Sequence, residues 1–221
     1  METSVKLVDQ YQGYSDAEVI QKVLNGEKQL FEILIRRNNP ALYKTGRTYG
    51  FNHEDTEDLM QEAYINSYLH LVDFRHEAGF KTWLIRIMLN LCYQKKQKLS
   101  FKNEIPSEIK PEQTTVVMFN PNTKDNEHMM INKELGHIIE KALQKIPLDY
   151  RVVFSLRELN GLNVKETSEA LDITESNVKV RLNRAKSMLK KELETMYSPA
   201  DVYEFNLVYC DRIVQKVMAS I

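Results

Sequence analysis

The fold of this chain is decided by residues 164–193, which read VKETSEALDITESNVKVRLNRAKSMLKKEL. A short helical pattern from Val164 to Leu171 is followed by the tight turn Asp172-Ile173-Thr174 and by a longer helical pattern over 176–193. Thr174 or Ser176 can cap the longer helix. Its predicted inner face consists of apolar residues at helical spacing: Val178, Leu182, Ala185, Leu189 and Leu193. Two helices joined by so short a turn, the second of them basic, predict a helix-turn-helix.

Positive charge gathers on the outside of the longer helix. Six Lys and Arg residues and no acidic residue lie between Asn177 and Lys191. Successive residues of a helix are about 100° apart. The side opposite the inner face therefore carries Ser176, Val180, Asn183 and Ser187. It is flanked on one side by Asn177, Arg181 and Arg184 and on the other by Lys179, Lys186 and Lys190. Such a helix inserts its N-terminal part into the DNA major groove while its outer cations contact phosphates. The alternative is a basic helix that only faces solvent.

Helical patterns continue on both sides of this motif. Upstream, one helix ends at Pro147, and a second helix over 150–159 is closed by Asn160-Gly161. Downstream, Ser198-Pro199 is a strong start for a C-terminal helix over about 199–220. Because this helix has one broad apolar side, we expect it to pack onto the protein's own second half or linker, or else to bind another protein.

A second helical block, from about Ser15 to Lys98, precedes the motif and contains an acidic helix. Asn52 can cap a helix over 55–72. Five carboxylates and no basic side chain lie between Glu54 and Glu62. By itself such a run of charge indicates a solvated surface. The expected apolar stripe of this helix consists of Met60, Tyr64, Tyr68 and Leu71, widened by Ala63, Ile65 and Leu69.

The next segment joins an aromatic loop to a basic helix. Residues 73–82, DFRHEAGFKT, contain two Phe residues and a glycine, and Thr82 can cap a helix over 83–97. Between Arg75 and Lys98 there are six Lys and Arg residues and one carboxylate. Cations beside aromatic side chains suit single-stranded nucleic acid, because the cations follow the backbone and the aromatics take unstacked bases. Trp83 by itself is better explained as a core residue.

The two blocks are predicted to form separate small domains, because the segment between them has the composition of a linker. Residues 100–131 contain Pro106, Pro111 and Pro121 and little apolar periodicity. Glycine and proline are otherwise scarce, at 7 and 6 residues of 221, which favours helices. We therefore expect an all-α protein with two small helical domains over 1–99 and 132–197, a linker over 100–131, and a C-terminal helical extension over 198–221.

Composition and spacing also exclude several classes of protein. The net charge is −1, so DNA binding has to come from local patches. The N-terminus lacks the pattern of a secretory signal and no apolar run is long enough to span a bilayer, so we expect a cytoplasmic protein without membrane insertion. Cys92 and Cys210 have no metal-ligand spacing and are expected to be reduced core residues. We find no nucleophile–base pair and no phosphate-binding glycine loop, and we expect no catalytic residue, no metal site and no cofactor.

Four segments resemble, in order, signatures of the bacterial extracytoplasmic-function (ECF) sigma factors, which are specificity subunits of RNA polymerase. They are DLMQEAY at 58–64, FKTWL at 80–84 with Ile87 and Asn90, IPLDYRVVFSLRELNG at 146–161, and VKVRLNRAK at 178–186. One such match would be weak, but four in order across a linker are specific. The resemblance implies a sigma factor that directs promoter recognition and transcription initiation.

The resemblance also implies partners and sites. Asp58, Gln61 and Glu62 are implied to dock on the clamp helices of the largest subunit of core RNA polymerase. The loop and the basic helix are implied to melt the minus-ten promoter element and capture a flipped base, through Phe74, Arg75, Phe80, Lys81, Arg86, Asn90 and Tyr93. The helix-turn-helix is implied to read the minus-thirty-five element through Ser176, Asn177, Lys179, Val180, Arg181, Asn183, Arg184 and Lys186. An anti-sigma factor is a further candidate partner.

Some residues depart from the family pattern, and they bear on the promoter sequence rather than on the class of protein. Val180 replaces a serine, so a hydrogen-bonding side chain is lost there. Asp172 stands where glycine is common, and Asp tolerates a left-handed backbone better than most residues. The main alternative function is a helix-turn-helix regulator that binds DNA alone as a dimer. That alternative explains the second domain but leaves the acidic helix and the aromatic loop without a role.

Overall fold

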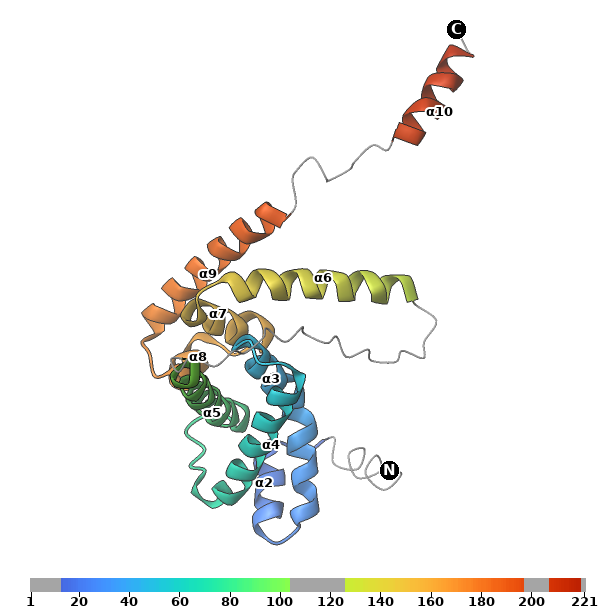
Figure 1. Cartoon of the computed structure of the whole chain (residues 1–221). Helices are drawn as coiled ribbons and strands as arrows, with labels where there is room; N and C mark the ends of the chain where they lie inside the picture. The colour runs from blue at the N-terminus through green and yellow to red at the C-terminus, as the bar shows by residue number, and fades with distance from the viewer. Residues whose placement is uncertain (1–12, 104–125, 197–206, 220–221) are drawn as a thin grey trace.

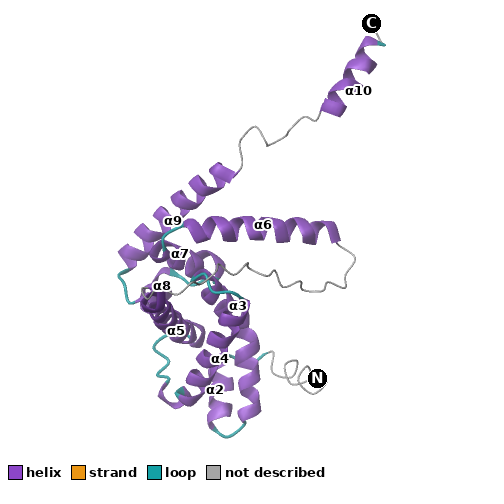
Figure 2. Ribbon diagram, viewed as in Figure 1, coloured by secondary structure: helices purple, strands orange, loops and turns teal. Residues whose placement is uncertain are grey.

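The structure is a computed structural model of the 221-residue chain, and it describes residues 13–103, 126–196 and 207–219. Within these ranges every regular element is a helix (Figure 1, Figure 2), which confirms the all-α prediction. The elements are α2 (Asp16–Leu24), η1 (Lys28–Leu30), α3 (Phe31–Thr48), α4 (His53–Leu69), η2 (Leu71–Asp73), α5 (Phe80–Asn103), α6 (Asn126–Lys145), α7 (Leu148–Phe154), η3 (Ser155–Leu159), α8 (Val164–Leu171), α9 (Glu175–Met196) and α10 (Leu207–Met218).

The first domain comprises α2 to α5 and packs around one apolar core. α3, α4 and α5 contact one another, and α2 packs against α3. Leu34, Leu84 and Met88 are fully buried between these helices. Asn52 caps α4 as predicted, because its side-chain oxygen accepts the backbone N–H of Asp55 at 2.7 Å.

Two expectations for the first domain are wrong. Thr82 does not cap α5, because that helix begins two residues earlier at Phe80 and leaves Thr82 only 4% exposed. Ile65 and Leu69 do not widen the apolar stripe of α4, because they are 52% and 65% exposed. α4 lies at the surface of the domain and buries only the side that faces α3 and α5.

The second domain comprises α6 to α9 and contains the predicted helix-turn-helix. α8 and α9 are joined by residues 172–174, and Asp172 adopts the left-handed conformation with φ 53° and ψ 48°. Thr174 rather than Ser176 caps α9, since its hydroxyl accepts the N–H of Asn177 at 3.2 Å. α9 packs on α6, α7 and α8 through its predicted inner face, on which Val178 and Ala185 are fully buried.

The helix before the motif changes geometry partway. α7 continues as the π-helical turn η3, which the N–H of Asn160 closes by donating to the carbonyl of Ser155 at 2.9 Å. Gly161, at φ 70°, then reverses the chain, as predicted. Single π-helical turns often mark functional places in a helix, and this one contacts α3 of the first domain.

The helices extend into the predicted linker from both sides. α5 runs on to Asn103 and α6 begins at Asn126, so the first and last residues of the 100–131 segment are helical. α5 can run past the predicted start of the linker at residue 100, because Pro106 is the earliest residue of the segment that cannot continue a helix.

The C-terminal extension contains the predicted helix, described as α10. Its predicted start at Ser198-Pro199 lies outside the described residues. In Figure 1, α10 lies apart from both domains, and all of its described side chains, over 212–219, are exposed. The described part of this helix therefore does not pack onto the second domain, contrary to the first of the two expectations. No helix within the described ranges has both the length and the apolar character needed to cross a membrane.

The two domains contact each other directly, which nothing in the sequence pattern predicted. α3 and α5 of the first domain pack against α7, η3 and α8 of the second. Residues of both domains, among them Val152 and Leu156 of the second, belong to one continuous apolar cluster.

Candidate nucleic-acid and protein interfaces

The outer face of α9 is a cationic surface, called the α9 surface below. Most of the residues predicted for it are exposed: Ser176, Asn177, Lys179, Val180, Asn183, Arg184 and Lys186. Arg181 is partly buried. Because Val178 and Ala185 are fully buried, they fix the rotation of the helix about its axis. Tertiary packing thus brings together the residues that helical spacing had grouped.

Groups of the second domain itself hold three of these cations. The pairs are exposed or half-exposed, and pairs of this kind contribute on the order of 0–1 kcal/mol. They therefore orient the cations without preventing them from moving to a phosphate. The three contacts are those of Arg181 with Asp149 at 3.5 Å, of Lys186 with Glu158 at 2.8 Å, and of Arg184 with the Tyr150 hydroxyl at 3.3 Å.

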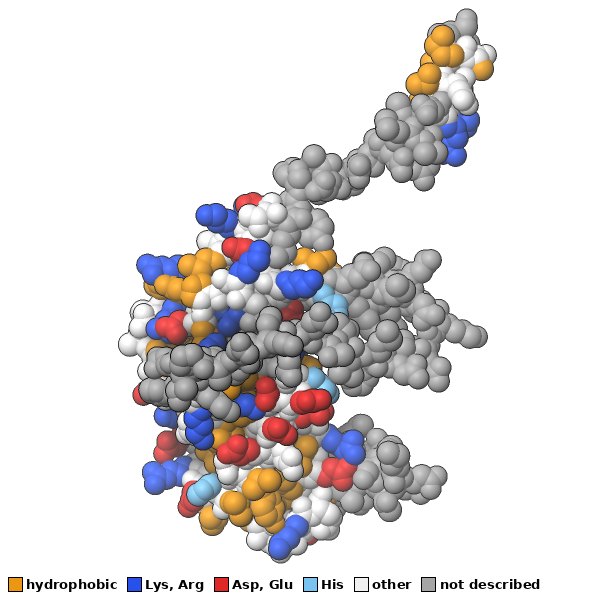
Figure 3. All heavy atoms as spheres, in the orientation of Figure 1, with side chains coloured by type: hydrophobic (Ala, Val, Ile, Leu, Met, Phe, Trp, Pro, Cys, Tyr) orange, Lys and Arg blue, Asp and Glu red, His pale blue; other side chains and the backbone are white. Residues whose placement is uncertain are grey.

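α4 carries a second surface, called the α4 surface, which is acidic toward the N-terminus and apolar toward the C-terminus. The predicted residues Asp58, Gln61 and Glu62 are all exposed. Ile65 and Leu69 continue the same side of the helix, because residues spaced by three and four positions lie above one another. Figure 3 shows acidic side chains beside a hydrophobic patch in the lower half of the molecule, over the first domain.

Ile65 and Leu69 are the residues of this surface that sequence reasoning missed. Because both residues are apolar, they were expected in the core. Their spacing from Asp58 and Glu62, however, already placed them on the acidic side of the helix. The spacing was therefore the better guide to their position.

The aromatic residues of the loop before α5 and of the first turn of α5 point into the domain. Phe74 and Phe80 are 9% and 4% exposed, and the ring centroid of Phe74 lies 5.0 Å from that of Trp83 and 5.8 Å from that of Phe80. These three rings anchor the loop, so Phe74 and Phe80 do not offer a face to unstacked bases in this arrangement. Arg75, beside them in sequence, is exposed.

The loop and α2 line an open, shallow hollow of about 440 Å³. Asp16, Ala17 and Ile20 of α2 line one side, and residues 74 and 76–80 line the other. His76 has φ 57°, which is uncommon for a residue other than glycine. The contribution of α2 could not be found from the sequence, because tertiary packing alone brings α2 to this loop.

The residues predicted on α5 divide between two sides of the helix. Arg86, Asn90 and Tyr93 are exposed and lie on one side, at spacings of four and three. Lys81 lies on the opposite side, and its Nζ donates to the backbone carbonyl of Asn160 in the second domain at 2.5 Å. The structure therefore brings three of the predicted residues together and separates Lys81 from them.

Cys92 lies in the core of the first domain. Burial raises the pKa of its thiol to about 12, so it stays protonated at neutral pH. Among the residues that the structure describes, no three His, Cys, Asp or Glu side chains are placed to hold a metal ion.

Two protein-family models match the chain. The model described as Sigma-70 region 2 matches residues 34–101, and the model described as Sigma-70, region 4 matches residues 136–189. The first match contains the α4 surface and the exposed side of α5, and the second contains the helix-turn-helix.

Relatives are similar over most of the chain. An ECF RNA polymerase sigma-E factor of Haemophilus influenzae is 27% identical over 186 residues, which cover 82% of this chain and 97% of that protein. The ECF RNA polymerase sigma factor SigW of Bacillus subtilis is 27% identical over 180 residues, which cover 80% and 96%.

Two solved structures share the fold. The sigma factor RpoE in complex with the anti-sigma factor NepR, from Bartonella quintana, has a TM-score of 0.61 at 20% identity and covers 74% of this chain and 96% of its own. CnrH in complex with the cytosolic domain of CnrY has a TM-score of 0.60 at 22% identity and covers 81% and 97%.

Proposed function

We propose that this protein, which belongs to the sigma-70 family as an RNA polymerase sigma factor of the ECF type, contacts polymerase and promoter through three separate surfaces. The α4 surface binds core polymerase. The hollow and the exposed side of α5 bind the minus-ten element, and the α9 surface binds the minus-thirty-five element. One observation supports the proposal. An acidic and apolar surface lies within the segment that matches Sigma-70 region 2, and a cationic surface lies within the segment that matches Sigma-70 region 4.

The α4 surface has the chemistry of a protein-binding site. Exposed aliphatic side chains such as Ile65 and Leu69 favour a partner that covers them, and the carboxylates of Asp58 and Glu62 favour a basic one. We assign the clamp helices of the largest polymerase subunit as this partner. The site implied by the family resemblance, Asp58, Gln61 and Glu62, is thereby extended by two apolar residues.

The side of α5 with Arg86, Asn90 and Tyr93 has the chemistry of a single-strand site. An arginine can pair with the phosphates of a nucleic-acid strand, and an exposed aromatic ring can stack on one of its bases. The hollow between α2 and the loop before α5 has room for one base flipped out of the duplex. Phe74 and Phe80 support this hollow from inside the domain, and Arg75, next to Phe74 in sequence, is exposed and can act as a cation for the backbone.

The α9 surface has the chemistry of a duplex-reading site. Its polar centre suits contact with base edges, and its cations suit contact with phosphates on either side. Lys179 and Arg184 are the strongest candidates for base contact, because both are exposed in the N-terminal half of the helix.

Transcription in vitro tests the proposal. Purified core polymerase is mixed with genomic DNA, with and without this protein, and transcript starts are sequenced. We expect a set of starts that depends on the protein and shares sequence about 10 and 35 base pairs upstream. A protein that elutes as a dimer, binds DNA alone and does not bind polymerase would instead be the helix-turn-helix regulator.

A regulatory partner is a second part of the proposal. Two of the solved structures that share this fold hold sigma factor RpoE with the anti-sigma factor NepR and CnrH with the cytosolic domain of CnrY. We propose that this protein also acts in the cytoplasm, where polymerase is found, and that an anti-sigma factor binds it there. Capture of this chain from lysate of its own host, with mass spectrometry of bound proteins, tests for the partner, and detection of the chain in separated cell fractions tests the location.

A further inference from the structure

Val180 is an apolar side chain in the centre of the otherwise polar α9 surface. It is 48% exposed, and it is the only large apolar side chain that is exposed over residues 175–195, the part of α9 whose side chains the structure describes. The residues one turn before and after it are exposed and polar or charged: Ser176, Asn177, Asn183 and Arg184. Valine favours a helix less than alanine or lysine does, so helix formation does not account for it. Its position therefore bears on what the α9 surface reads.

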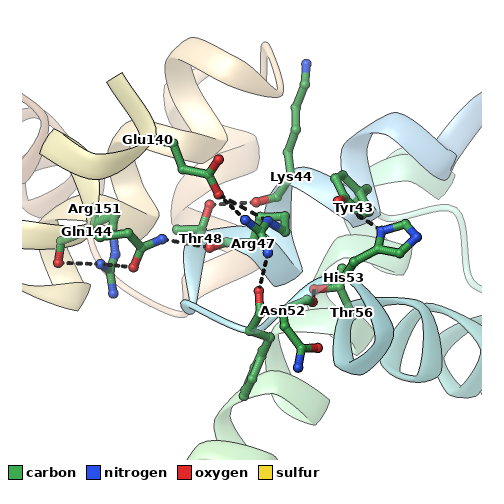
Figure 4. A network of polar contacts seen from close by, with 11 residues as sticks. Tyr43, Lys44, Arg47, Thr48, Asn52, His53, Thr56, Glu140, Gln144 and Arg151 are labelled. Carbon is green, nitrogen blue, oxygen red and sulfur yellow. Dashed lines mark hydrogen bonds and ion pairs between the residues drawn. The ribbon is translucent and has the colours of Figure 1, made fainter. Parts of the chain in front are cut away.

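The second domain holds Val180 in one direction. Val178 and Ala185, on the inner side of α9, are fully buried and fix the rotation of the helix. α9 packs on α6 and α7, and Arg151 joins these two helices, because its Nη1 donates to the carbonyl of Gln144 at 2.8 Å and to the side-chain oxygen of Gln144 at 2.5 Å (Figure 4). A valine in a helix has one strongly preferred χ1 rotamer. Its methyl groups are therefore presented outward with little rotational freedom to lose on binding.

Cations lie on both sides of Val180. Lys179 and Arg181 are its neighbours in sequence, so each lies about 100° from it around the helix axis. Lys179 is exposed, and Arg181 is oriented by Asp149 at 3.5 Å. Cations on the two flanks of a helix in the major groove suit the phosphates at the edges of that groove. The side chain between the two cations then faces the base edges on the floor of the groove.

The major groove offers one group that suits an aliphatic side chain. Every base pair displays hydrogen-bond donors or acceptors there, and thymine alone adds an apolar group, the methyl on C5. Valine has no polar side-chain atom, so against a donor or acceptor it would displace water without replacing the lost hydrogen bond. Against the methyl group, both partners bury apolar surface. The polar neighbours remain free to bond adjacent base pairs, since Asn183 suits adenine and Arg184 suits guanine.

We propose that Val180 reads the 5-methyl group of one thymine in the minus-thirty-five element. The inference rests on the proposed function, in which the α9 surface binds that element. The chemistry recognised is the 5-methyl group of a pyrimidine, which thymine and 5-methylcytosine both display in the major groove. Thymine is assigned because it is the one base of unmodified DNA that carries this group. Val180 thereby determines the preferred base at one position by apolar contact, whereas its neighbours act through hydrogen bonds and charge.

Removal of single methyl groups from the DNA tests the proposal. A promoter found by sequencing of transcript starts is synthesised with deoxyuridine in place of one thymine at a time, on either strand of the minus-thirty-five element. Deoxyuridine keeps every hydrogen-bonding group of thymine and lacks only the methyl. Binding of the complex of this protein with core polymerase is expected to weaken by about 3- to 10-fold at one position, because one apolar contact is lost there. Replacement of a thymine outside both promoter elements is expected to have no effect.

A variant assigns the lost contact to Val180. In complex with polymerase, Val180→Ser is expected to bind the thymine and deoxyuridine forms of that position equally, because the aliphatic side chain is gone. The control Leu24→Ser removes an aliphatic side chain that is 44% exposed on α2, and it is expected to keep the full loss seen with the parent. An equal loss in the parent and in Val180→Ser overturns the assignment. Indifference of the parent to every deoxyuridine replacement overturns it without any variant.

Methylated cytosine distinguishes the two sources of the methyl group. The sensitive base pair is replaced by a C·G pair, with the cytosine in place of the thymine, with and without a 5-methyl group. The methyl is expected to raise the affinity of the parent complex by about 3- to 10-fold and to leave that of Val180→Ser unchanged. An equal gain in both proteins overturns the reading by Val180. Mapped promoters that carry cytosine at this position and bind only when it is methylated would overturn the assignment of thymine.

Failure of this inference can be told apart from failure of the proposed function. A complex that binds the unmodified promoter and starts transcription there, yet ignores every replacement of thymine by deoxyuridine, leaves the proposed function standing and overturns only the role of Val180. A protein that directs polymerase to no start at all would contradict the proposed function and this inference together. Loss of affinity at one thymine in the parent, absent in Val180→Ser and kept in Leu24→Ser, supports both.

Discussion

α4 and α9 are both long helices with a charged outer side, and they differ in what lies beside the charge. On α9, cations alternate with polar side chains, and four of them contact groups of their own domain. On α4, Asp58 and Glu62 have no ion pair within the described part of the chain, and exposed Ile65 and Leu69 continue the same side. Apolar side chains beside a charge suit a protein partner, whereas cations among polar side chains suit a phosphate backbone. The kind of partner therefore depends on the side chains that lie beside the charged residues as well as on the sign of the charge.

The largest effect is expected from reversing the charge of the α4 surface. Asp58→Lys/Glu62→Lys should weaken binding to core polymerase by at least about 100-fold, because two carboxylates that face a basic partner become repulsive. Helicity by circular dichroism should not change, since Lys has a helix propensity close to that of Glu. The control Glu169→Lys/Glu194→Lys makes the same change of charge on the second domain. Equal polymerase binding by the double variant and the parent would remove the α4 acids from the site.

A smaller effect is expected from removing only the apolar part of the α4 surface. Ile65→Ser/Leu69→Ser should weaken polymerase binding by about 10- to 100-fold, because each half-exposed aliphatic side chain loses about 0.7–1.4 kcal/mol of burial in the complex. The melting temperature should hold, since both residues are exposed in the free protein. Leu24→Ser removes an aliphatic side chain that is 44% exposed on α2 and serves as the control. Unchanged affinity in the double variant would mean that the α4 surface acts through charge alone.

Single substitutions on the α9 surface separate base reading from phosphate contact. Lys179→Ala and Arg184→Ala should each cost about 1–3 kcal/mol of promoter affinity and relax the preference at one base pair if the side chain reads a base. Substitution of a residue that contacts only phosphate should weaken binding to all sequences alike. It should also lower the slope of log affinity against log salt concentration by about one. Binding titrations of the polymerase complex on promoter variants at several salt concentrations distinguish the two. No effect on affinity, preference or slope would show that the residue does not touch DNA.

The residue that departs from the family pattern on this surface should affect preference more than affinity. Val180 is 48% exposed, so Val180→Ser should change the free energy of unfolding by less than about 0.5 kcal/mol. The new hydroxyl can bond a base edge, and we expect the preferred minus-thirty-five sequence to change at one position. Sequencing of selected promoter variants measures this preference. An unchanged preference would place Val180 outside the reading set.

The smallest effect is expected from a third amphipathic helix, α10. Its described side chains are exposed, and Ile213, Val214 and Val217 are each about half exposed. Ending the chain after Met196 should therefore shift the melting temperature by less than about 2 °C and leave promoter-directed transcription intact. A large drop in melting temperature would show that α10 packs on the domains after all. Loss of a co-purifying protein without loss of stability would show that α10 binds a partner.

The parts of the structure that were predictable are those in which local pattern and burial agree. The bounds of α8, the left-handed Asp172 and the inner face of α9 follow from turn chemistry and helical spacing within one continuous segment. The exposure of the side chains on the first domain was predicted less well. Phe74 and Phe80 were expected at the DNA and lie in the core, because an aromatic residue in a loop is equally able to anchor it.

The residues that only the tertiary structure could place are those whose partners are remote in sequence. Lys81 donates to Asn160, Thr48 bonds Ser155, and α2 lines the hollow with a loop that lies far along the chain. A helical sequence determines by its spacing which side chains share a face, because that period is set by the backbone itself. It does not determine which faces meet, because apolar faces of similar size can pack in more than one way, and the choice depends on the fit of all the helices at once. By itself, this sequence determined an all-α sigma factor with a helix-turn-helix. The tertiary structure alone decided that the α4 surface stays open and that the two domains meet.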